Sequence, residues 1–226
     1  MLTHAPWTEV PGLRHGFLDR RECAGATRWE PIVAAVGAAL PVATARQVHG
    51  ARAVVAAPGE APLGEADAVV AATPGLLAGV VTADCVPVLL LARGGRAAAA
   101  AHAGWRGAAA GVLEAAVERL CTAAGAAPAA VEAVLGPAIG PCCYEVGPEV
   151  RAAFCRRTGD LTAPAWSGAG GRARLDLRAA CRLLLTAAGV RAAAVLGPCT
   201  RCDRRYCSYR RDGAGAGRQL AFIGRV

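Results

Sequence analysis

The fold is decided by residues 80–107, which read VVTADCVPVLLLARGGRAAAAAHAGWRG. Two apolar runs in this stretch, residues 86–92 and 97–101, have the length of buried strands and are separated by the turn sequence RGGR. This pattern predicts a β-hairpin. Because a hairpin brings the ends of its strands together, Cys85 before the first strand and His102 after the second should lie side by side at a sheet edge.

A thiol next to an imidazole can serve two kinds of chemistry. Cys85 could be a nucleophile activated by His102, or both could be ligands of a transition metal, and their spacing does not decide between these roles. A third candidate ligand is His49, in the sequence RQVHG, where the following glycine allows a sharp turn. The chain has only four histidines. His49, Cys85 and His102 therefore form a candidate metal site.

Composition excludes several classes of function. The formal net charge is +8, but all 25 basic residues are arginine, and the chain has no lysine and no asparagine. Without lysine there is no Schiff base and no Walker-type phosphate loop, and without asparagine there is no N-glycosylation site. The arginine excess is better explained by a compositional bias of the genome than by a nucleic-acid-binding surface. The only serines, Ser167 and Ser208, are not in a G-x-S-x-G motif, which argues against a serine hydrolase.

The cysteine content and the apolar segments bear on location. There are ten cysteines, and the first residues, MLTHAPWTEVPGLRHG, lack the apolar segment of an export signal. We therefore expect a cytoplasmic protein with reduced thiols. The longest apolar region, residues 66–92, is interrupted by Pro74, Asp84 and Pro87, which favours a buried sheet over a membrane span.

The remaining patterns predict alternating strands and helices in one domain, residues 1–226. Strands are expected at 52–57, 67–72, 76–81 and 218–224, and a short helix at 32–40. An amphipathic helix is predicted from the apolar stripe Leu113, Ala116, Val117, Leu120 and Cys121. If this helix begins near Gly107, its free amides lie beyond His102, where phosphate could bind with help from Arg106.

An internal repetition suggests two similar α/β halves. The sequence TAAG, a strand and then LGP occurs at residues 122–137 and again at 186–198, each time after an amphipathic helix. The second helix carries Leu177, Ala180, Cys181, Leu184 and Leu185 behind the possible cap Asp176. Two such units would place their Gly-Pro loops at the same end of a layered fold.

Five segments together resemble the laccase-domain family of purine nucleoside phosphorylases, formerly called polyphenol oxidases. They occur in order along nearly the whole chain and read RQVHG (46–50), TADCVPV (82–88), HAGWRG (102–107), GPAIGPCCYEV (136–146) and SYRRDG (208–213). The resemblance implies an α/β/β/α layered fold with mixed sheets and an internal duplication. It also implies a catalytic zinc held by His49, Cys85 and His102, with copper as a possible substitute.

The resemblance extends to residues around the metal. It places Arg20, from a Gly-Phe-x-x-Arg segment, and the loop containing Cys142 at the active site, and it makes Arg210 part of the site's edge. Gln47, beside the ligand His49, joins Arg20, Arg106, Cys142 and Arg210 as a candidate substrate or phosphate contact. Asp84, next to Cys85, is the candidate for proton transfer or for orienting the ligands.

The function implied by the resemblance is phosphorolysis of adenosine, inosine, guanosine and methylthioadenosine to free base and ribose 1-phosphate, with adenosine deaminase activity. The partners would be nucleoside and inorganic phosphate, with the chain a monomer or homodimer that binds no membrane. Two histidines and one cysteine leave a fourth metal position open for water or substrate.

Several alternatives remain open. A single copper could support slow phenol oxidation, although a multicopper laccase needs more imidazoles than four. A metal-free cysteine hydrolase, with Cys85 as nucleophile and a role in editing cell-wall precursors, is a second possibility. The run of arginines and tyrosines at 201–211 superficially suits single-stranded nucleic acid, but the resemblance favours an active-site edge. Cys199, Cys202 and Cys207 have zinc-ribbon spacing, but no fourth ligand is evident, so no zinc is expected there.

Overall fold

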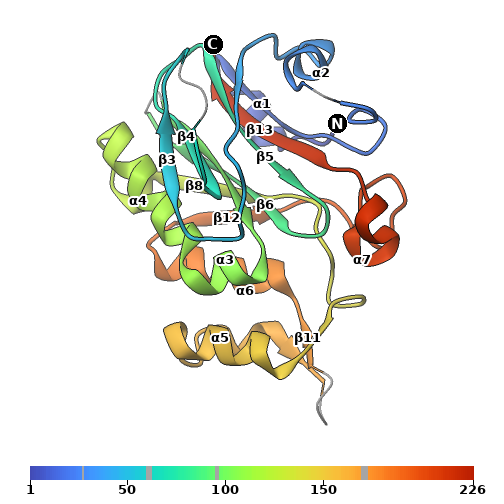
Figure 1. Ribbon diagram of the computed structural model, residues 1–226. Helices are drawn as coiled ribbons and strands as arrows, with labels where there is room; N and C mark the ends of the chain where they lie inside the picture. The colour runs from blue at the N-terminus through green and yellow to red at the C-terminus, as the bar shows by residue number, and fades with distance from the viewer. Residues whose placement is uncertain (27, 60–62, 95–96, 169–172) are drawn as a thin grey trace.

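The computed structural model describes residues 1–26, 28–59, 63–94, 97–168 and 173–226. The chain forms a six-stranded sheet and a four-stranded sheet. The two sheets pack against each other as central layers, with helices on the other face of the larger sheet (Figure 1). A further helix packs on the outer face of the smaller sheet. The predicted α/β/β/α arrangement with mixed sheets is therefore confirmed.

The predicted hairpin forms the middle of the larger sheet. Strand β6 (Val86–Ala92) pairs antiparallel with β7 (Ala98–Ala103). Side chains on β6 alternate between the two faces, so that Val88 and Leu90 pack against the helices while Leu89 packs against the smaller sheet. Both faces are buried, which explains why the sequence shows a continuous apolar run. Two residues of the predicted turn, 95 and 96, lie outside the described residues.

The other strands complete two mixed sheets. The larger has the order β12-β8-β6-β7-β4-β3 and the smaller β1-β13-β5-β2. Their bounds are β1 (Leu13–Phe17), β2 (Val42–Ala43), β3 (Ala53–Ala56), β4 (Ala68–Ala71), β5 (Leu76–Thr82), β8 (Val131–Leu135), β12 (Ala192–Val195) and β13 (Gln219–Arg225). The four further strands predicted from the sequence are confirmed as β3, β4, β5 and β13, within a residue or two at each end.

The amphipathic helix is confirmed as α4 (Val112–Ala124), although its predicted start is wrong. The predicted stripe is buried except for Cys121, which is partly exposed. Gly111 has a φ of 103° and ends a separate helix, α3 (Trp105–Ala110), so α4 does not begin near Gly107. The N-terminus that follows His102 belongs to the six-residue α3, which replaces the long helix expected there.

The short helix predicted at 32–40 is α2 (Glu30–Ala35), which starts earlier and ends sooner. Gly37 has a φ of 82°, which stops the helix before the predicted end. Val33 is fully buried, and it packs with Leu77 and Phe222 on the outer face of the smaller sheet. This helix is the fourth layer.

The repeated TAAG and LGP segments lie in adjacent helix–strand units. Helix α6 (Leu177–Ala187) leads to β12 as α4 leads to β8, and the two strands pair in parallel with Val195 opposite Leu135. The loops that follow both strands therefore emerge at the same end of the sheet. Asp176 caps α6 by accepting a hydrogen bond from the Ala179 amide at 3.0 Å, as the sequence suggested.

Smaller elements complete the chain. Helix α5 (Pro148–Thr158) and a three-stranded sheet lie below the main sheets in Figure 1. The remaining elements are α1 (Ala5–Thr8), β9 (Glu145–Val146), β10 (Trp166–Ser167), β11 (Ala173–Leu175) and α7 (Tyr209–Asp212), with 3-10 turns at Pro128–Ala130, Ala163–Ala165 and Gly213–Gly215. Within the described ranges, each helix is too short or too polar to cross a bilayer.

Candidate metal centre and adjoining pocket

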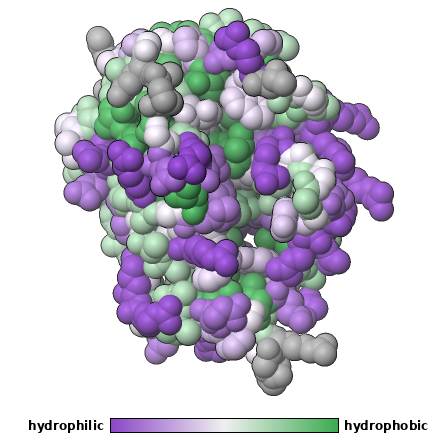
Figure 2. Space-filling view, in the orientation of Figure 1, coloured by the Kyte–Doolittle hydropathy of each residue, from purple (hydrophilic) through white to green (hydrophobic). Residues whose placement is uncertain are grey.

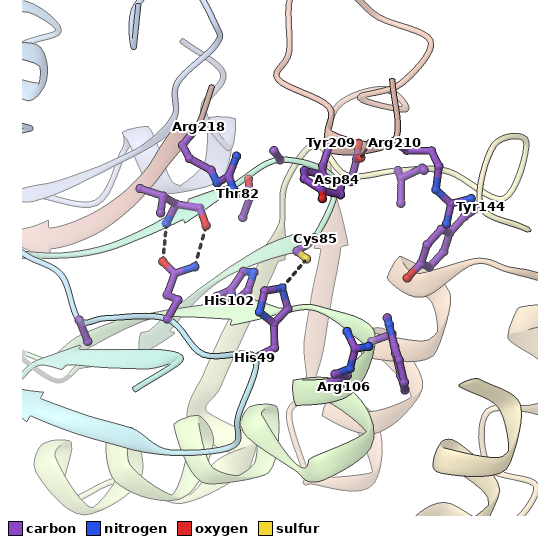
Figure 3. Close-up of a pocket in the computed structure, with 16 residues that line it drawn as sticks. His49, Thr82, Asp84, Cys85, His102, Arg106, Tyr144, Tyr209, Arg210 and Arg218 are labelled. Atoms are coloured by element: carbon purple, nitrogen blue, oxygen red, sulfur yellow. Dashed lines mark hydrogen bonds between the residues drawn. The ribbon is translucent and has the colours of Figure 1, made fainter. Parts of the chain in front are cut away.

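The fold brings the three predicted metal ligands together. His102 lies on β7 opposite Pro87, so Cys85, just before β6, reaches the same end of the hairpin. His49 comes from the loop between β2 and β3, with a φ of 59° that turns its ring toward the hairpin. The ligand atoms of His49, Cys85 and His102 all lie within 4.8 Å of one another, and Cys85 Sγ is 3.9 Å from His49 Nε2 (Figure 3).

Asp67, a residue that the sequence analysis did not single out, holds two of these ligands. Its carboxylate lies 2.8 Å from His102 Nδ1 and accepts hydrogen bonds from the backbone amides of Val48, His49 and Gly50 at 2.8–3.1 Å. The Asp67 side chain is completely buried. Because Nδ1 of His102 is engaged by this carboxylate, Nε2 is the ring nitrogen left to serve as a ligand.

The electrostatics of the three residues favour a thiolate. Burial alone would raise the pKa of Cys85, but hydrogen bonds and positive charge from His102 and His49 outweigh it and lower the pKa to about 7. Burial alone would lower the pKa of His102, but Asp67 and the Cys85 sulfur outweigh it and raise the pKa to about 9. The thiolate is the form of cysteine that binds metals and attacks electrophiles.

The space around the three residues fits a metal ion. A Cβ on Gly104 would come within 2.9 Å of His49 Cδ2 and 3.0 Å of Cys85 Sγ, so glycine is needed where the chain passes the ligands. Tetrahedral zinc with nitrogen and sulfur ligands separates them by roughly 3.3–3.6 Å, which small side-chain movements would achieve here. Two imidazoles and a thiolate suit zinc or copper and leave one position open.

A pocket of about 540 Å³ adjoins the three residues. Figure 2 shows a hollow on this face surrounded by hydrophilic side chains, and Figure 3 shows His49, Cys85 and His102 at its centre. The other labelled residues that line the pocket are Thr82, Asp84, Arg106, Tyr144, Tyr209, Arg210 and Arg218. Its volume lies within the usual range of roughly 300–1,000 Å³ for small-molecule sites.

Asp84 is at the pocket wall, but its carboxylate already has partners. Oδ1 accepts a hydrogen bond from Thr200 Oγ1 at 2.6 Å, and Oδ2 accepts one from the Arg210 amide at 2.6 Å. The Asp84 backbone has a φ of 88°, which is rare for residues other than glycine. Asp84 therefore ties the loop containing Cys85 to the C-terminal segment. Of the two roles predicted for it, these contacts are compatible with orienting the ligands.

Three of the predicted contact residues line the pocket in different ways. The guanidinium of Arg106 lies 4.4 Å from the centre of the Trp105 ring, and that of Arg210 lies 5.2 Å from the Tyr144 ring. Gln47 also lines the pocket, but its amide group both donates to and accepts from the backbone of Val81 at 2.7 Å. Gln47 thus anchors the loop that carries His49, with its hydrogen-bonding atoms already engaged.

The other two predicted contact residues do not line this pocket. Arg20 is exposed, and its Nη1 lies 3.4 Å from Asp212 Oδ2. Cys142 lines a smaller cavity with Cys143, Glu145 and three arginines, whereas Tyr144 from the same loop reaches the large pocket. Cys142 thus lies outside the large pocket, and Tyr144 is the side chain of this loop that lines it.

Sequence reasoning also missed residues that the fold brings in from a distance. Arg218 lines the pocket from a segment far along the chain from the hairpin, and no sequence pattern indicated it; Tyr209 also lines the pocket, from the 201–211 run that the resemblance placed at the site's edge. Asp67 gave one signal that could have been used, since it is the one carboxylate in the otherwise apolar sequence ADAVVAA at residues 66–72. A buried carboxylate needs hydrogen-bond partners, and loop amides or a histidine are common ones.

The fold and the site define a mixed α/β protein with a candidate His-Cys-His metal centre next to a small-molecule pocket. Residues 18–226 match the family model described as multi-copper polyphenol oxidoreductase laccase. The chain therefore belongs to this laccase-like family.

Curated relatives carry the names of two nucleoside enzymes. A purine nucleoside phosphorylase of Pseudomonas aeruginosa is 44% identical over 168 residues, which cover 74% of this chain and 67% of the relative. The purine nucleoside phosphorylase YfiH of Escherichia coli is 42% identical, covering 78% of this chain and 71% of the relative. Adenosine deaminase RL5, from an unknown prokaryotic organism, is 40% identical, and the match spans 73% of this chain but only 64% of that protein.

Solved structures share the fold across nearly the whole chain. The Neisseria meningitidis protein NMB0706 superposes with a TM-score of 0.83 at 34% identity, covering 97% of this chain and 96% of that one. YlmD of Geobacillus stearothermophilus superposes with a TM-score of 0.82 at 29% identity, covering 98% and 94%. These matches support the layered architecture described above.

Proposed function

We propose that the protein is a zinc-dependent purine nucleoside phosphorylase that also deaminates adenosine. The observation that carries this proposal is the position of His49, Cys85 and His102 at the wall of a pocket lined by aromatic and arginine side chains. The names of the relatives supply the substrate class. When bound, zinc would supply Lewis acidity at the position left open by its three protein ligands.

The pocket residues suit a nucleoside and an anion together. Trp105, Tyr144 and Tyr209 offer flat apolar surfaces on which a purine ring can stack. Arg106, Arg210 and Arg218 offer cationic groups that can bind phosphate through charge-assisted hydrogen bonds. In phosphorolysis a phosphate oxygen forms a bond to C1′ of the ribose, the bond from C1′ to the base breaks, and the base leaves with a proton from solvent or a pocket residue.

The chain's own residues would preorganise this reaction. Asp67 fixes the imidazole of His102 and the backbone around His49, and Asp84 joins the Cys85 loop to the segment containing Arg210. These contacts hold the metal ligands and the substrate-facing arginine in one rigid arrangement before substrate binds. Preorganised groups of this kind lower the barrier because they need little rearrangement during the reaction.

The test is to reconstitute the purified protein with Zn²⁺ and to follow inosine with and without inorganic phosphate. The proposal predicts hypoxanthine and ribose 1-phosphate only when phosphate is present, and inosine formation when adenosine is supplied without phosphate. Free ribose in place of ribose 1-phosphate would indicate hydrolysis, and oxidation of phenols by copper-loaded protein alone would favour an oxidase. Turnover by metal-free protein, with covalent trapping of Cys85 by an electrophile, would favour a cysteine hydrolase.

A further inference from the structure

A second group of metal-ligating side chains lies outside the site described above. Cys142, Cys143, Cys199 and Cys202 place their sulfur atoms within 4.8 Å of one another. Cys202 Sγ lies 3.4 Å from Cys143 Sγ and 3.8 Å from Cys142 Sγ. Four sulfurs arranged tetrahedrally around zinc, at about 2.3 Å each, are about 3.8 Å apart. These distances are therefore close to those of a zinc site with four cysteine ligands.

The parallel pairing of β8 and β12 brings the two pairs of cysteines together. Cys142 and Cys143 follow β8, and Cys199 and Cys202 follow β12, at the same end of the sheet. A parallel bridge between Ala138 and Cys199 continues the pairing beyond the strands. The cysteines are far apart in sequence, and this is why the spacing of Cys199, Cys202 and Cys207 did not reveal a fourth ligand.

Cys207 does not belong to this group, because it is buried elsewhere, where its sulfur would contact a Cβ on Gly217 at 3.5 Å. Of the three cysteines in the sequence pattern, only Cys199 and Cys202 belong to the group. Cys142 and Cys143, from the other loop, complete it.

The backbone around Cys199 is arranged to stabilise a thiolate. The amide of Gly140 donates a hydrogen bond to Cys199 Sγ at 3.2 Å. The Asp203 amide donates to the Cys199 carbonyl at 3.0 Å, which closes a tight turn around the C-x-x-C segment. Amide groups aimed at a cysteine sulfur favour its charged form, which is the form that binds metal.

The charge near the cysteines is complementary to a metal–thiolate centre. A small cavity of about 190 Å³ is lined by three arginines and one carboxylate together with two of the cysteines: Arg174, Arg201, Arg210, Glu145, Cys142 and Cys143. A divalent cation with four thiolates carries a net charge of about −2, which neighbouring guanidinium groups stabilise.

We propose that Cys142, Cys143, Cys199 and Cys202 bind a structural zinc ion. Zinc forms four bonds to sulfur, and the thiols release their protons to solvent as they bind. With four protein ligands the ion has no open position, so it serves structure and not catalysis.

The ion would join two loops that border the large pocket. The first loop leads into Tyr144, which lines the pocket, and the second contains Thr200, whose hydroxyl donates to Asp84. Loss of the ion should therefore loosen this wall of the pocket. The inference depends only on the sulfur arrangement and is independent of the reaction catalysed.

The first experiment compares zinc stoichiometry between variants. Reduced protein is incubated with excess Zn²⁺, desalted and analysed for metal by mass spectrometry. We expect the Cys199→Ser/Cys202→Ser double variant to hold one zinc ion fewer per chain than the wild type, whereas Cys155→Ser, at an exposed cysteine on α5, should hold the same amount. Equal zinc in the double variant and the wild type would overturn the proposal. The expected difference of one ion per chain is the same whether the His-Cys-His site is loaded in both proteins or empty in both.

The second experiment does not require the double variant to fold. Cys85→Ala removes the only thiolate of the other candidate centre, so thiolate-to-metal absorption by Co²⁺ in this variant must come from the four-cysteine group. We expect strong absorption of this kind, bleached by added Zn²⁺. A Cys85→Ala protein that is folded and reduced but lacks the absorption would contradict the proposal, and so would thiol titration that finds these cysteines oxidised in pairs with no metal bound.

Discussion

Asp67 Oδ1 lies 2.8 Å from Nδ1 of His102, deep inside the molecule, while the same carboxylate binds three consecutive backbone amides of the loop that carries His49. One side chain therefore orients a metal ligand on β7 and shapes the loop of another. A carboxylate in this position also increases the basicity of the imidazole toward a metal.

Replacing Asp67 with asparagine should weaken metal binding without removing a ligand. The amide cannot accept as many hydrogen bonds as the carboxylate, and it gives His102 less negative charge. We expect Asp67→Asn to lower the affinity for Zn²⁺ about 10- to 100-fold, measured by competition with a chromogenic chelator. Asp176→Asn, at the cap of α6, is the control and should affect only stability. Equal zinc affinity in Asp67→Asn and the wild type would refute the role assigned to Asp67.

Gly104 should tolerate no side chain while the site is intact. The Cβ of alanine would come within 3.0 Å of both His49 and Cys85 and push them apart. Gly104→Ala should therefore lose zinc from the His-Cys-His site, as shown by metal analysis, while the protein stays folded by circular dichroism. Gly215→Ala is a matched control, because no atom lies within 4 Å of its added Cβ and its backbone is not left-handed. Full zinc retention in Gly104→Ala would show that the site is wider than described.

His15 should make stability depend on pH. Its ring accepts a hydrogen bond from the His4 amide at 2.9 Å, and burial, followed by the nearby charge of His4, lowers its pKa to about 4. The unfolded chain, with an ordinary pKa of about 6.5, then binds more protons between these values. The contribution of neutral His15 to the free energy of unfolding is thus fully present above pH 6.5 and is lost as the pH falls toward 4.

Urea denaturation at pH 7 and pH 5 measures this effect. We expect the free energy of unfolding to fall by about 2 kcal/mol more in the wild type than in His15→Gln, whose amide oxygen can accept the same hydrogen bond without titrating. A similar fall in both proteins would mean that His15 is protonated without penalty in the folded state.

Arg106 tests the assignment of phosphate binding. If its guanidinium binds the anion, Arg106→Gln should raise KM for phosphate about tenfold, and KM for inosine should change much less. Arg119→Gln, on the exposed face of α4, is the control for the loss of one positive charge. A rise in KM for inosine alone would place Arg106 at the base or ribose instead.

Local patterns predicted the parts of the fold that depend on nearby residues. The hairpin, the stripe on α4 and the cap of α6 follow from short-range periodicity and turn chemistry, and each was confirmed. The boundary near Gly107 was wrong because the left-handed backbone of Gly111 splits the segment into two helices. In so alanine-rich a stretch no side chain marks this break.

The site was only partly predictable for a related reason. His49, Cys85 and His102 have chemistry that stands out in the sequence, and the hairpin explains why two of them meet. Asp67, Arg218 and the pairing of Cys142 with Cys202 depend on contacts between segments distant along the chain. Such contacts follow from the register of parallel strands and the packing of two sheets, which no local pattern encodes.

The central claim is that one metal ion, held by His49, Cys85 and His102, is required for phosphorolysis. The most direct test is the rate of hypoxanthine formation from inosine and phosphate by zinc-reconstituted Cys85→Ala, compared with Cys155→Ala as a control for the loss of a thiol. We predict that Cys85→Ala loses activity by about 10³-fold or more while Cys155→Ala matches the wild type. Undiminished, phosphate-dependent turnover by Cys85→Ala would contradict the account.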